Sequence, residues 1–292
     1  MSRTAEEIAS QPETWTWALD RLAEVERVLP AAGERVAVIG CGTSFYIAEA
    51  YARAREAGGA GETDAVVASE FSATRSYDRV LAISRSGTTT EVVRALEALP
   101  SGLPSTAISA VPGAPVVRAA RESVILDGAD EESVVQTRFA TTTLALLRAQ
   151  LGEDLTNAIA DARDAVGRPL PIEAGAFDRF VFLGTGWSVG LAHEAALKMR
   201  EAALAWSESY PAMEFRHGPI SLAAPDTAVW HLGAADPALV ADVEATGAFV
   251  VRGGLDPMAE LILVQRTAVE LALARGLDPD HPRNLTRSVV LS

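Results

Sequence analysis

The sequence predicts an α/β protein with parallel sheets, organised as two similar halves. Short β-branched, apolar runs alternate with longer helical patterns, as in parallel strands joined by helices. The segment Glu34–Ser44 (ERVAVIGCGTS) resembles Asp178–Ser188 (DRFVFLGTGWS), about half the chain later. Each copy has an apolar strand, a Gly-x-Gly-x-Ser turn and a helix. Because 292 residues suffice for two domains of ordinary size, we expect domains at 1–166 and 167–292.

The expected elements follow this alternation in both halves. Strands are predicted at Arg35–Ile39, Ala65–Val67, Arg79–Ile83, Ser105–Ser109, Ser123–Leu126, Asp178–Leu183, Ala228–His231 and Ala248–Val251. Helices are predicted at Tyr46–Glu56, Thr89–Leu99, Gln136–Leu151, Asn157–Val166, Val189–Leu204 and Met258–Arg275. Ser207–Ile220 matches neither pattern and is predicted as a long irregular loop, a feature that is usually functional in compact domains.

Composition excludes several classes of function. A net charge of −14 argues against a nucleic-acid binder, because phosphate backbones require clustered cations. No stretch is long and apolar enough to predict a membrane span, and the first residues do not resemble a signal peptide. The single cysteine fits a reducing compartment, so we expect a cytoplasmic protein. Neither metal-ligand spacing nor a complete dinucleotide fingerprint is present, so we expect no metal and no cofactor.

A hydroxyl-rich turn predicts a phosphate site. The segment ISRSGTTTE (Ile83–Glu91) follows a predicted strand and opens a helix. It carries five hydroxyl residues around one glycine: Ser84, Ser86, Thr88, Thr89 and Thr90. An anion is favoured by the free N–H groups of a helix N-terminus at the carboxyl edge of a sheet. A polar helix cap is the alternative interpretation, but the number of hydroxyls favours anion binding.

A second candidate site lies on the helix His193–Trp206. Glu194, Lys198 and Glu201 are spaced i, i+4 and i+7, which places them on one face. Lys198 is the only lysine beside 24 arginines. An exposed face with ordinary helix ion pairs is the alternative interpretation.

Proton transfer on a sugar phosphate requires groups of this kind. A partly desolvated glutamate beside a lysine can remove the C2 proton, while the ammonium stabilises the enediolate. A histidine can protonate the ring oxygen near neutral pH, and His217 in the predicted loop is the candidate. A structural role remains the alternative for His217.

Motifs along nearly the whole chain carry a family resemblance. They are EIASQP, GCGTS, ASEF, ISRSGTTTE, EESVVQTRFATTTLALL, EAALKMRE, EFRHGP and DPDHPRNLTRSV. In order and spacing they resemble the double sugar-isomerase (SIS) domain proteins, and in particular the isomerase part of glucosamine-6-phosphate synthases. The resemblance implies two tandem SIS domains, each a parallel sheet flanked by helices in a flavodoxin-like three-layer sandwich. It does not extend to a glutaminase domain, so we expect no use of glutamine as an ammonia source.

The resemblance also implies roles for individual residues. Glu201 matches the proton-shuttling glutamate and Lys198 the lysine three residues before it. His217 matches the ring-opening histidine, which in that family reaches the site of a neighbouring subunit, so a homodimer with shared active sites is implied. The positions that match the family's phosphate-binding residues are Thr43, Ser44, Ser84, Ser86 and Thr89.

Two arginines depart from the family pattern. Arg85 stands where the family enzyme has a glutamine, and it adds a cation to the expected phosphate site. Arg287 stands where the family enzyme has a sugar-contacting lysine that forms an imine. A guanidinium stays protonated and forms no imine, but it can still bind sugar or phosphate oxygens. The arginine at position 287 therefore argues against a Schiff-base mechanism at that point and leaves proton transfer by Glu201 intact.

The expected function is therefore that of a phosphosugar isomerase or isomerising aminosugar-phosphate deaminase. Its expected substrate is a hexose or hexosamine 6-phosphate, with proton transfer between C1 and C2. Removal of the same C2 proton with loss of the C3 hydroxyl would give a dehydratase acting on an N-acetylhexosamine 6-phosphate. A non-catalytic sugar-phosphate sensor is the alternative from another class, and it would not need Glu201, Lys198 and His217 together.

Overall fold

The computed structural model describes residues 2–173 and 175–291, which form two compact units. The five-stranded unit comprises residues 13–155 and 286–291, and the four-stranded unit comprises residues 2–12 and 156–285 apart from position 174. Relative to the predicted division after residue 166, the N-terminal residues and 156–166 belong with the second sheet. The C-terminal tail belongs with the first.

The five-stranded sheet has the strand order β2-β1-β3-β4-β5, and every pair is parallel. Its strands are β1 (Val36–Gly40), β2 (Thr63–Val67), β3 (Arg79–Ile83), β4 (Ser105–Ser109) and β5 (Glu122–Ile125). β1 and β3 lie side by side in register, with Val36 opposite Arg79 and Ile39 opposite Ala82. The loops that follow these two strands therefore leave the same edge of the sheet.

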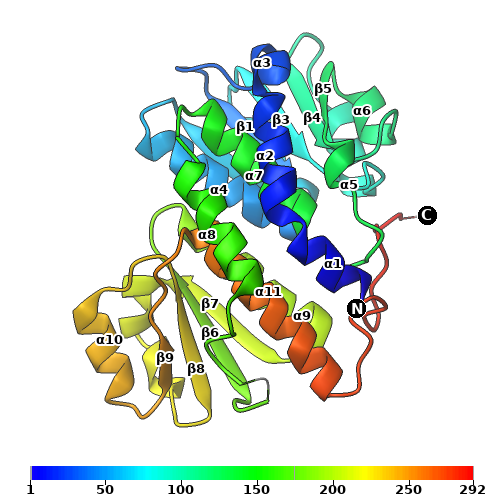
Figure 1. Ribbon diagram of the computed structural model, residues 1–292. Coiled ribbons are helices and arrows are strands. Elements are labelled where there is room, and N and C mark those ends of the chain that lie inside the picture. The colour runs from blue at the N-terminus through cyan, green and yellow to red at the C-terminus, as the bar shows by residue number, and fades with distance from the viewer. Residues whose placement is uncertain (1, 174, 292) are drawn as a thin grey trace. The chain divides into compact units, whose positions relative to one another are not determined.

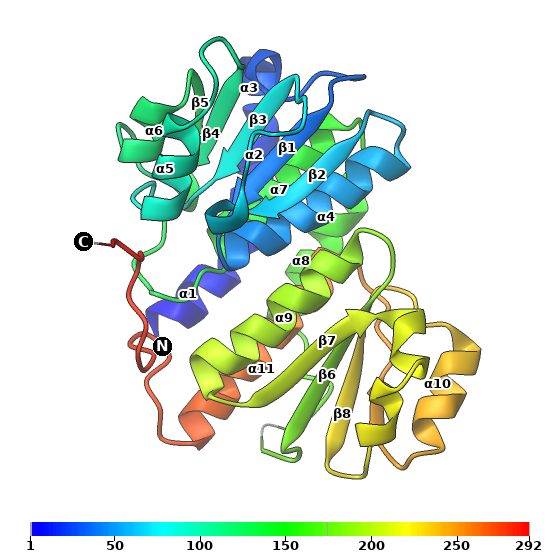
Figure 2. The same cartoon turned by 180° about the vertical axis from the view of Figure 1, so that it is seen from behind.

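Helices cover both faces of this sheet (Figures 1 and 2). They are α2 (Gln11–Asp20), α3 (Leu22–Val25), α4 (Thr43–Ala57), α5 (Thr90–Glu97), α6 (Pro115–Ala119) and α7 (Arg138–Gln150), with short 3₁₀ turns at η1 (Glu26–Val28), η2 (Ala68–Glu70) and η3 (Asp127–Ala129). Val92 and Leu96 of α5 and Val116 of α6 pack on Ile39 and Val80 of the sheet. On the other face α4 packs on β1, β2 and α7. The result is a three-layer core.

The four-stranded sheet has the order β7-β6-β8-β9 and is also parallel throughout. Its strands are β6 (Arg179–Gly184), β7 (Trp206–Pro211), β8 (Thr227–Leu232) and β9 (Phe249–Val251). Its helices are α1 (Arg3–Ala9), α8 (Thr156–Gly167), α9 (Ser188–Ala203), α10 (Pro237–Glu244) and α11 (Pro257–Ala274), with 3₁₀ turns η4 (Ala212–Arg216) and η5 (Pro219–Leu222).

In this unit α9 and α11 pack together on one face of the sheet, while α10 packs on the other (Figure 1). Leu239 and Val243 of α10 contact Val181, Leu183 and Val229 of the strands. Within the described ranges, no helix has both the length and the apolar character needed to cross a membrane.

The parallel α/β architecture confirms the prediction from the alternating pattern, and β3 and β4 have the predicted bounds. The prediction of an irregular loop at Ser207–Ile220 is wrong, because this segment holds most of β7 followed by η4 and η5. β7 is an edge strand in which only Ser207 is buried. An edge strand of this kind needs no apolar run, so SESYP lacks the signal that a central strand gives.

The repeated Gly-x-Gly-x-Ser segments form the same tight turn in both units. The second glycine of each copy has a positive φ, +54° at Gly42 and +58° at Gly186. A Cβ on Gly40 would lie 2.7 Å from the Ser44 carbonyl carbon, and a Cβ on Gly184 would likewise collide with the Ser188 backbone. Glycine is thus required where the helix starts directly above the strand end.

Candidate functional site

The two loops predicted to bind phosphate both leave the carboxyl edge of the five-stranded sheet. Thr43 and Ser44 are the first residues of α4 after β1, and both are buried. Residues 84–89, here called the phosphate loop, follow β3 and lead into α5. Ligands of parallel sheets bind at this edge, and the N-terminus of α5 lies there.

Hydroxyls converge inside the phosphate loop. Ser84 and Ser86 are buried, and the Ser84 hydroxyl lies 3.5 Å from that of Thr89. Ser86 accepts hydrogen bonds from both the N–H and the hydroxyl of Thr88, at 3.2 and 3.1 Å. Thr89 occupies the N-cap position of α5 without making a side-chain capping bond in the described chain. The Thr89 hydroxyl therefore does not cap α5, as it would have to do if this segment were only a polar helix cap.

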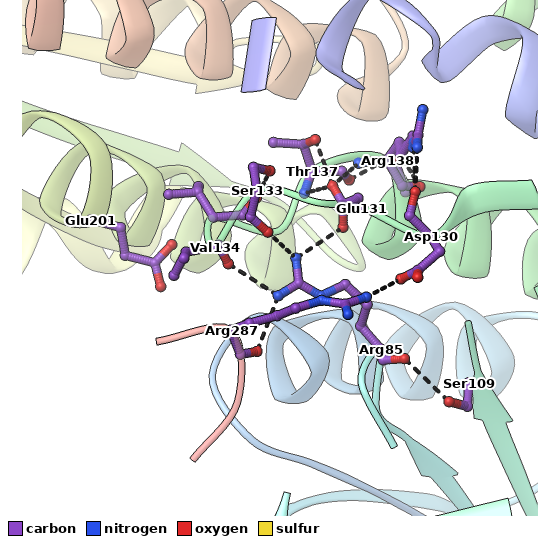
Figure 3. A network of polar contacts seen from close by, with 12 residues as sticks. Arg85, Ser109, Asp130, Glu131, Ser133, Val134, Thr137, Arg138, Glu201 and Arg287 are labelled. Atoms are coloured by element: carbon purple, nitrogen blue, oxygen red, sulfur yellow. Dashed lines mark hydrogen bonds and ion pairs between the residues drawn. The ribbon is translucent and has the colours of Figure 1, made fainter. Parts of the chain in front are cut away.

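Arg85 has a different setting from the neighbouring hydroxyls (Figure 3). Its side chain is 1% exposed and lies 3.4 Å from the Glu131 carboxylate, which is fully buried. Its guanidinium also donates to the carbonyls of Ser133, Val134 and Arg287 at 2.9, 3.1 and 3.1 Å. Arg85 is predicted to bind phosphate, but most of its N–H donors are thus bonded to acceptors of the protein itself.

Glu131 in turn is held by the start of α7. Its Oε1 accepts from the N–H of Thr137 at 2.5 Å, the Thr137 hydroxyl at 2.7 Å and the Arg138 N–H at 2.9 Å. These donors replace water around the buried carboxylate, and the helix N-terminus favours its charge. Arg85 supplies the opposite charge.

Arg287, the predicted sugar-binding residue, lies in the C-terminal tail (residues 286–291). Its guanidinium forms an ion pair with Asp130, and its carbonyl accepts from Arg85. The side chain remains 41% exposed. The side chain of Arg85 therefore contacts the backbone of Arg287 within the five-stranded unit.

The face of α9 carries a buried charge cluster. The Lys198 ammonium lies 3.2 Å from Glu194 Oε1 and 2.5 Å from Glu201 Oε2. Lys198 and Glu194 are 1% and 0% exposed, whereas the Glu201 side chain is 20% exposed. Burial disfavours the ammonium, but the two carboxylates outweigh it and raise the pKa of Lys198 above its ordinary value. The alternative of an exposed helix face is wrong, because the lysine is enclosed.

Glu201 is the member of this cluster that solvent, and hence a substrate, can reach. The Lys198 ammonium lies beside its carboxylate, at 2.5 Å from Oε2. Glu194 lies behind Lys198 and offsets its charge. The three residues together form a base with an adjacent cation.

His217 lies in the same unit at the end of η4, where its N–H donates to the Glu214 carbonyl at 2.9 Å. Its side chain is exposed. The nearby ring contact of Tyr210 with Phe215 and the buried Ala212 anchor η4 on the sheet. His217 is thus presented at the surface by a fixed turn.

A cavity of about 810 Å³ in the four-stranded unit lies away from the predicted site residues. It lies beyond β8 and β9, between α10 and residues 252–257, and none of the predicted site residues lines it. Its charged residues are already used: Arg252 pairs with Glu244, and Asp256 caps α11. Among the described residues, no group of three or more His, Cys, Asp or Glu is placed to hold a metal ion.

Sequence reasoning missed Glu131 and Ser288. An arginine within a buried hydroxyl turn requires a carboxylate partner, and the acidic run before the helix starting at Arg138 was the available signal. Ser288, whose hydroxyl accepts from Ser86 and Thr88, has no comparable signal in the sequence.

Comparison with known protein families identifies a SIS domain in the chain. The SIS domain model matches residues 31–151, the part of the chain that holds the five-stranded sheet.

Relatives extend the similarity to the whole chain. The glutamine–fructose-6-phosphate aminotransferase of Aeropyrum pernix is 30% identical over 98% of this chain, which spans only 56% of that relative's length. Glucosamine-6-phosphate deaminase from Thermotoga maritima has a TM-score of 0.87 at 23% identity, covering 99% of this chain and all of the other. Tagatose-6-phosphate ketose/aldose isomerase from Escherichia coli has a TM-score of 0.76 at 20% identity, covering 97% and 98%.

The buried charge cluster generates a stability prediction. Lys198→Met removes the buried ammonium that lies between Glu194 and Glu201, so the unfolding free energy at pH 8 should fall by about 3 kcal/mol. Because the pKa of Lys198 is raised above its ordinary value, the stability that its charge adds is fully present below that ordinary value and is lost only at higher pH. The deficit should therefore be as large at pH 5.5 as at pH 8 as far as Lys198 is concerned. Urea unfolding at both pH values measures it.

The matched control is Arg163→Met, which removes an exposed cation from α8 and should change stability by at most about 0.5 kcal/mol. A Lys198→Met protein as stable as wild type at both pH values would contradict a buried, charged cluster.

Proposed function

We propose that the chain is a SIS-domain enzyme that isomerises a hexose or hexosamine 6-phosphate, a proposal supported by the match of residues 31–151 to the SIS domain model. The observation that carries the proposal is the cluster on α9. Its accessible carboxylate, Glu201, is held beside a buried ammonium, Lys198. A purely structural ion pair would not need the accessible carboxylate, and a sensor would not need a base.

The proposed chemistry is a proton shuttle on the open-chain sugar. The Glu201 carboxylate takes the proton from C2, and the electrons of that bond form the C1–C2 enediolate. Glu201 then returns the proton to C1 while the hydroxyl proton on O2 passes to O1, which yields the ketose. The Lys198 ammonium stabilises the negative oxygen that develops between these steps. No metal or redox group takes part in this sequence of steps.

An aminosugar substrate extends the same steps to deamination. If C2 carries an amine, the shuttle produces a ketose imine instead of a ketose. Water then hydrolyses the imine to ketose phosphate and ammonia. The deaminase named among the similar structures supports this branch. Arg287 cannot form an imine with the sugar, and the proposed mechanism includes no imine between the protein and the sugar.

The phosphate loop is the proposed binding site for the 6-phosphate. Hydroxyls beside the N-terminus of α5 are contributed by Ser84, Ser86 and Thr89. Further hydroxyls come from Thr43 and Ser44 at the start of α4, which follows the neighbouring strand β1. Neutral donors suit a chain whose net charge is −14, because hydrogen-bond dipoles act locally while distant charges are screened.

We further propose a homodimer in which His217 opens the sugar ring in the partner's site. The exposed position of His217 supports this, because a proton donor for its own site would not need to face solvent. Exposed apolar side chains flank the same segment, with Trp206 at 71% and Leu222 at 53% exposure. A location in the cytoplasm is supported by the single, unpaired cysteine.

The phosphate site is tested with a Ser84→Ala, Ser86→Ala, Thr89→Ala triple variant. Removing three hydroxyls should weaken hexose 6-phosphate binding by several kcal/mol, since each bond to a charged group contributes about 1.5–3 kcal/mol. Calorimetry measures the affinity, and Ser101→Ala on the exposed turn before β4 is the control. Equal affinities for all three proteins would make the loop a helix cap only.

The base is tested with Glu201→Gln, which keeps the shape of the side chain but cannot accept a proton. Substrate should still bind, while turnover falls by a factor on the order of 10² or more. In heavy water the wild type should exchange the C2 proton of the sugar phosphate, read by NMR over hexose, hexosamine and N-acetylhexosamine 6-phosphates. A variant that exchanges as fast as wild type would rule out Glu201, and loss of the C3 hydroxyl would identify a dehydratase.

The shared site is tested by mixing Glu201→Gln chains with His217→Asn chains. Each variant alone should be nearly inactive. After subunit exchange, a mixed dimer holds one site with both lesions and one with neither, so about a quarter of wild-type activity should return. No recovery despite demonstrated exchange would place both groups in the same chain's site.

A further inference from the structure

Arg85 connects three segments of the five-stranded unit (Figure 3). It stands in the phosphate loop, and its Nη1 donates to Glu131 Oε2 and to the Ser133 carbonyl. Its Nη2 donates to the carbonyls of Val134 and Arg287. The four hydrogen bonds donated by the Arg85 guanidinium thus join the phosphate loop to the segment before α7 and to the C-terminal tail.

The tail continues along the phosphate loop beyond this contact. The Ser288 hydroxyl accepts from Ser86 at 3.1 Å and from Thr88 at 2.8 Å. The Thr90 N–H donates to the Val289 carbonyl at 3.3 Å, and the Leu291 N–H donates to the Thr90 hydroxyl at 2.9 Å. These contacts are made by short polar groups at a partly exposed surface, where each contributes little alone. The hydrogen bonds of Arg85 are the buried, charge-assisted members of this series of contacts.

The side chain suits this role better than other cations or amides would. A guanidinium has five donors in a fixed plane, whereas a lysine presents a single flexible ammonium and a glutamine two N–H groups. Only Nε of Arg85 is without an acceptor in the described chain, and it is buried. A phosphate held by this residue would have to be bound by that one donor.

We propose that Arg85 is a positioning residue that fixes the C-terminal tail on the phosphate loop, and not a phosphate ligand. It acts on the sugar through Arg287, whose carbonyl it holds. This last step rests on the proposed function, whereas the docking of the tail does not. Arg85 thereby sets the position of the residue that replaces the family's sugar-contacting lysine.

The test compares Arg85→Gln with Arg55→Gln in the full chain. Arg55 is a matched control because it is also buried in this unit and donates to the carbonyls of Ala31 and Glu34, away from the phosphate loop. Both variants should lower the melting temperature. Hydrogen exchange read by mass spectrometry should be at least about tenfold faster in residues 286–291 of Arg85→Gln, and unchanged there in Arg55→Gln.

Two further measurements, one kinetic and one of binding, separate positioning of the tail by Arg85 from direct contact of Arg85 with phosphate. Arg85→Gln should raise KM for the sugar phosphate about tenfold, while its affinity for inorganic phosphate, measured by calorimetry, stays within about threefold of wild type. Tail exchange equal to wild type would overturn the proposal, as would equal loosening by Arg55→Gln. A large loss of phosphate affinity with a protected tail would make Arg85 a direct ligand.

A second variant covers the case in which Arg85→Gln does not fold. Arg85→Lys keeps a cation beside Glu131 but loses the planar fork, so it should fold and still release the tail. A lysine variant with a fully protected tail would overturn the proposal. The exchange measurement needs no turnover, so failure of the proposed isomerase activity is distinguished from failure of this inference.

Discussion

Charge compensation in a water-poor environment is the constraint on which both candidate sites depend. An ionised side chain loses its hydration when it is buried, and it remains charged only if an opposite charge and hydrogen bonds replace the water. Lys198 meets this requirement with Glu194 and Glu201, and Arg85 meets it with Glu131 and three carbonyls. Each of these two cations has partners that are fixed by the fold of its own unit.

The two clusters use this constraint differently. Around Lys198 there are two carboxylates for one ammonium, and one of them, Glu201, keeps an exposed edge. That surplus carboxylate is the group that can take part in proton transfer. Around Arg85 there is one carboxylate for one guanidinium, and the remaining donors are directed at backbone carbonyls. Such an arrangement orders polypeptide segments and leaves little donor capacity for a ligand.

The choice of arginine or lysine is therefore informative in a chain with a single lysine. The ammonium of Lys198 serves where two carboxylates must approach one point. The planar fork of Arg85 serves where acceptors from separate segments must be joined. Arg287 is paired with Asp130 while its carbonyl accepts from Arg85, so this residue takes part in the network with both backbone and side chain.

The sequence alone predicted the α/β class, the repeated glycine turns and most strands, because these depend on local patterns of apolar and glycine residues. It also indicated which residue types gather in the phosphate loop and on α9. It could not locate β7, since a half-buried edge strand carries no continuous apolar run. Only the tertiary structure decided that Lys198 is enclosed and that Arg85 faces Glu131 and the tail. Those contacts join residues far apart in the chain, and burial, which determines whether a charge is paired or solvated, is a property of the packed structure.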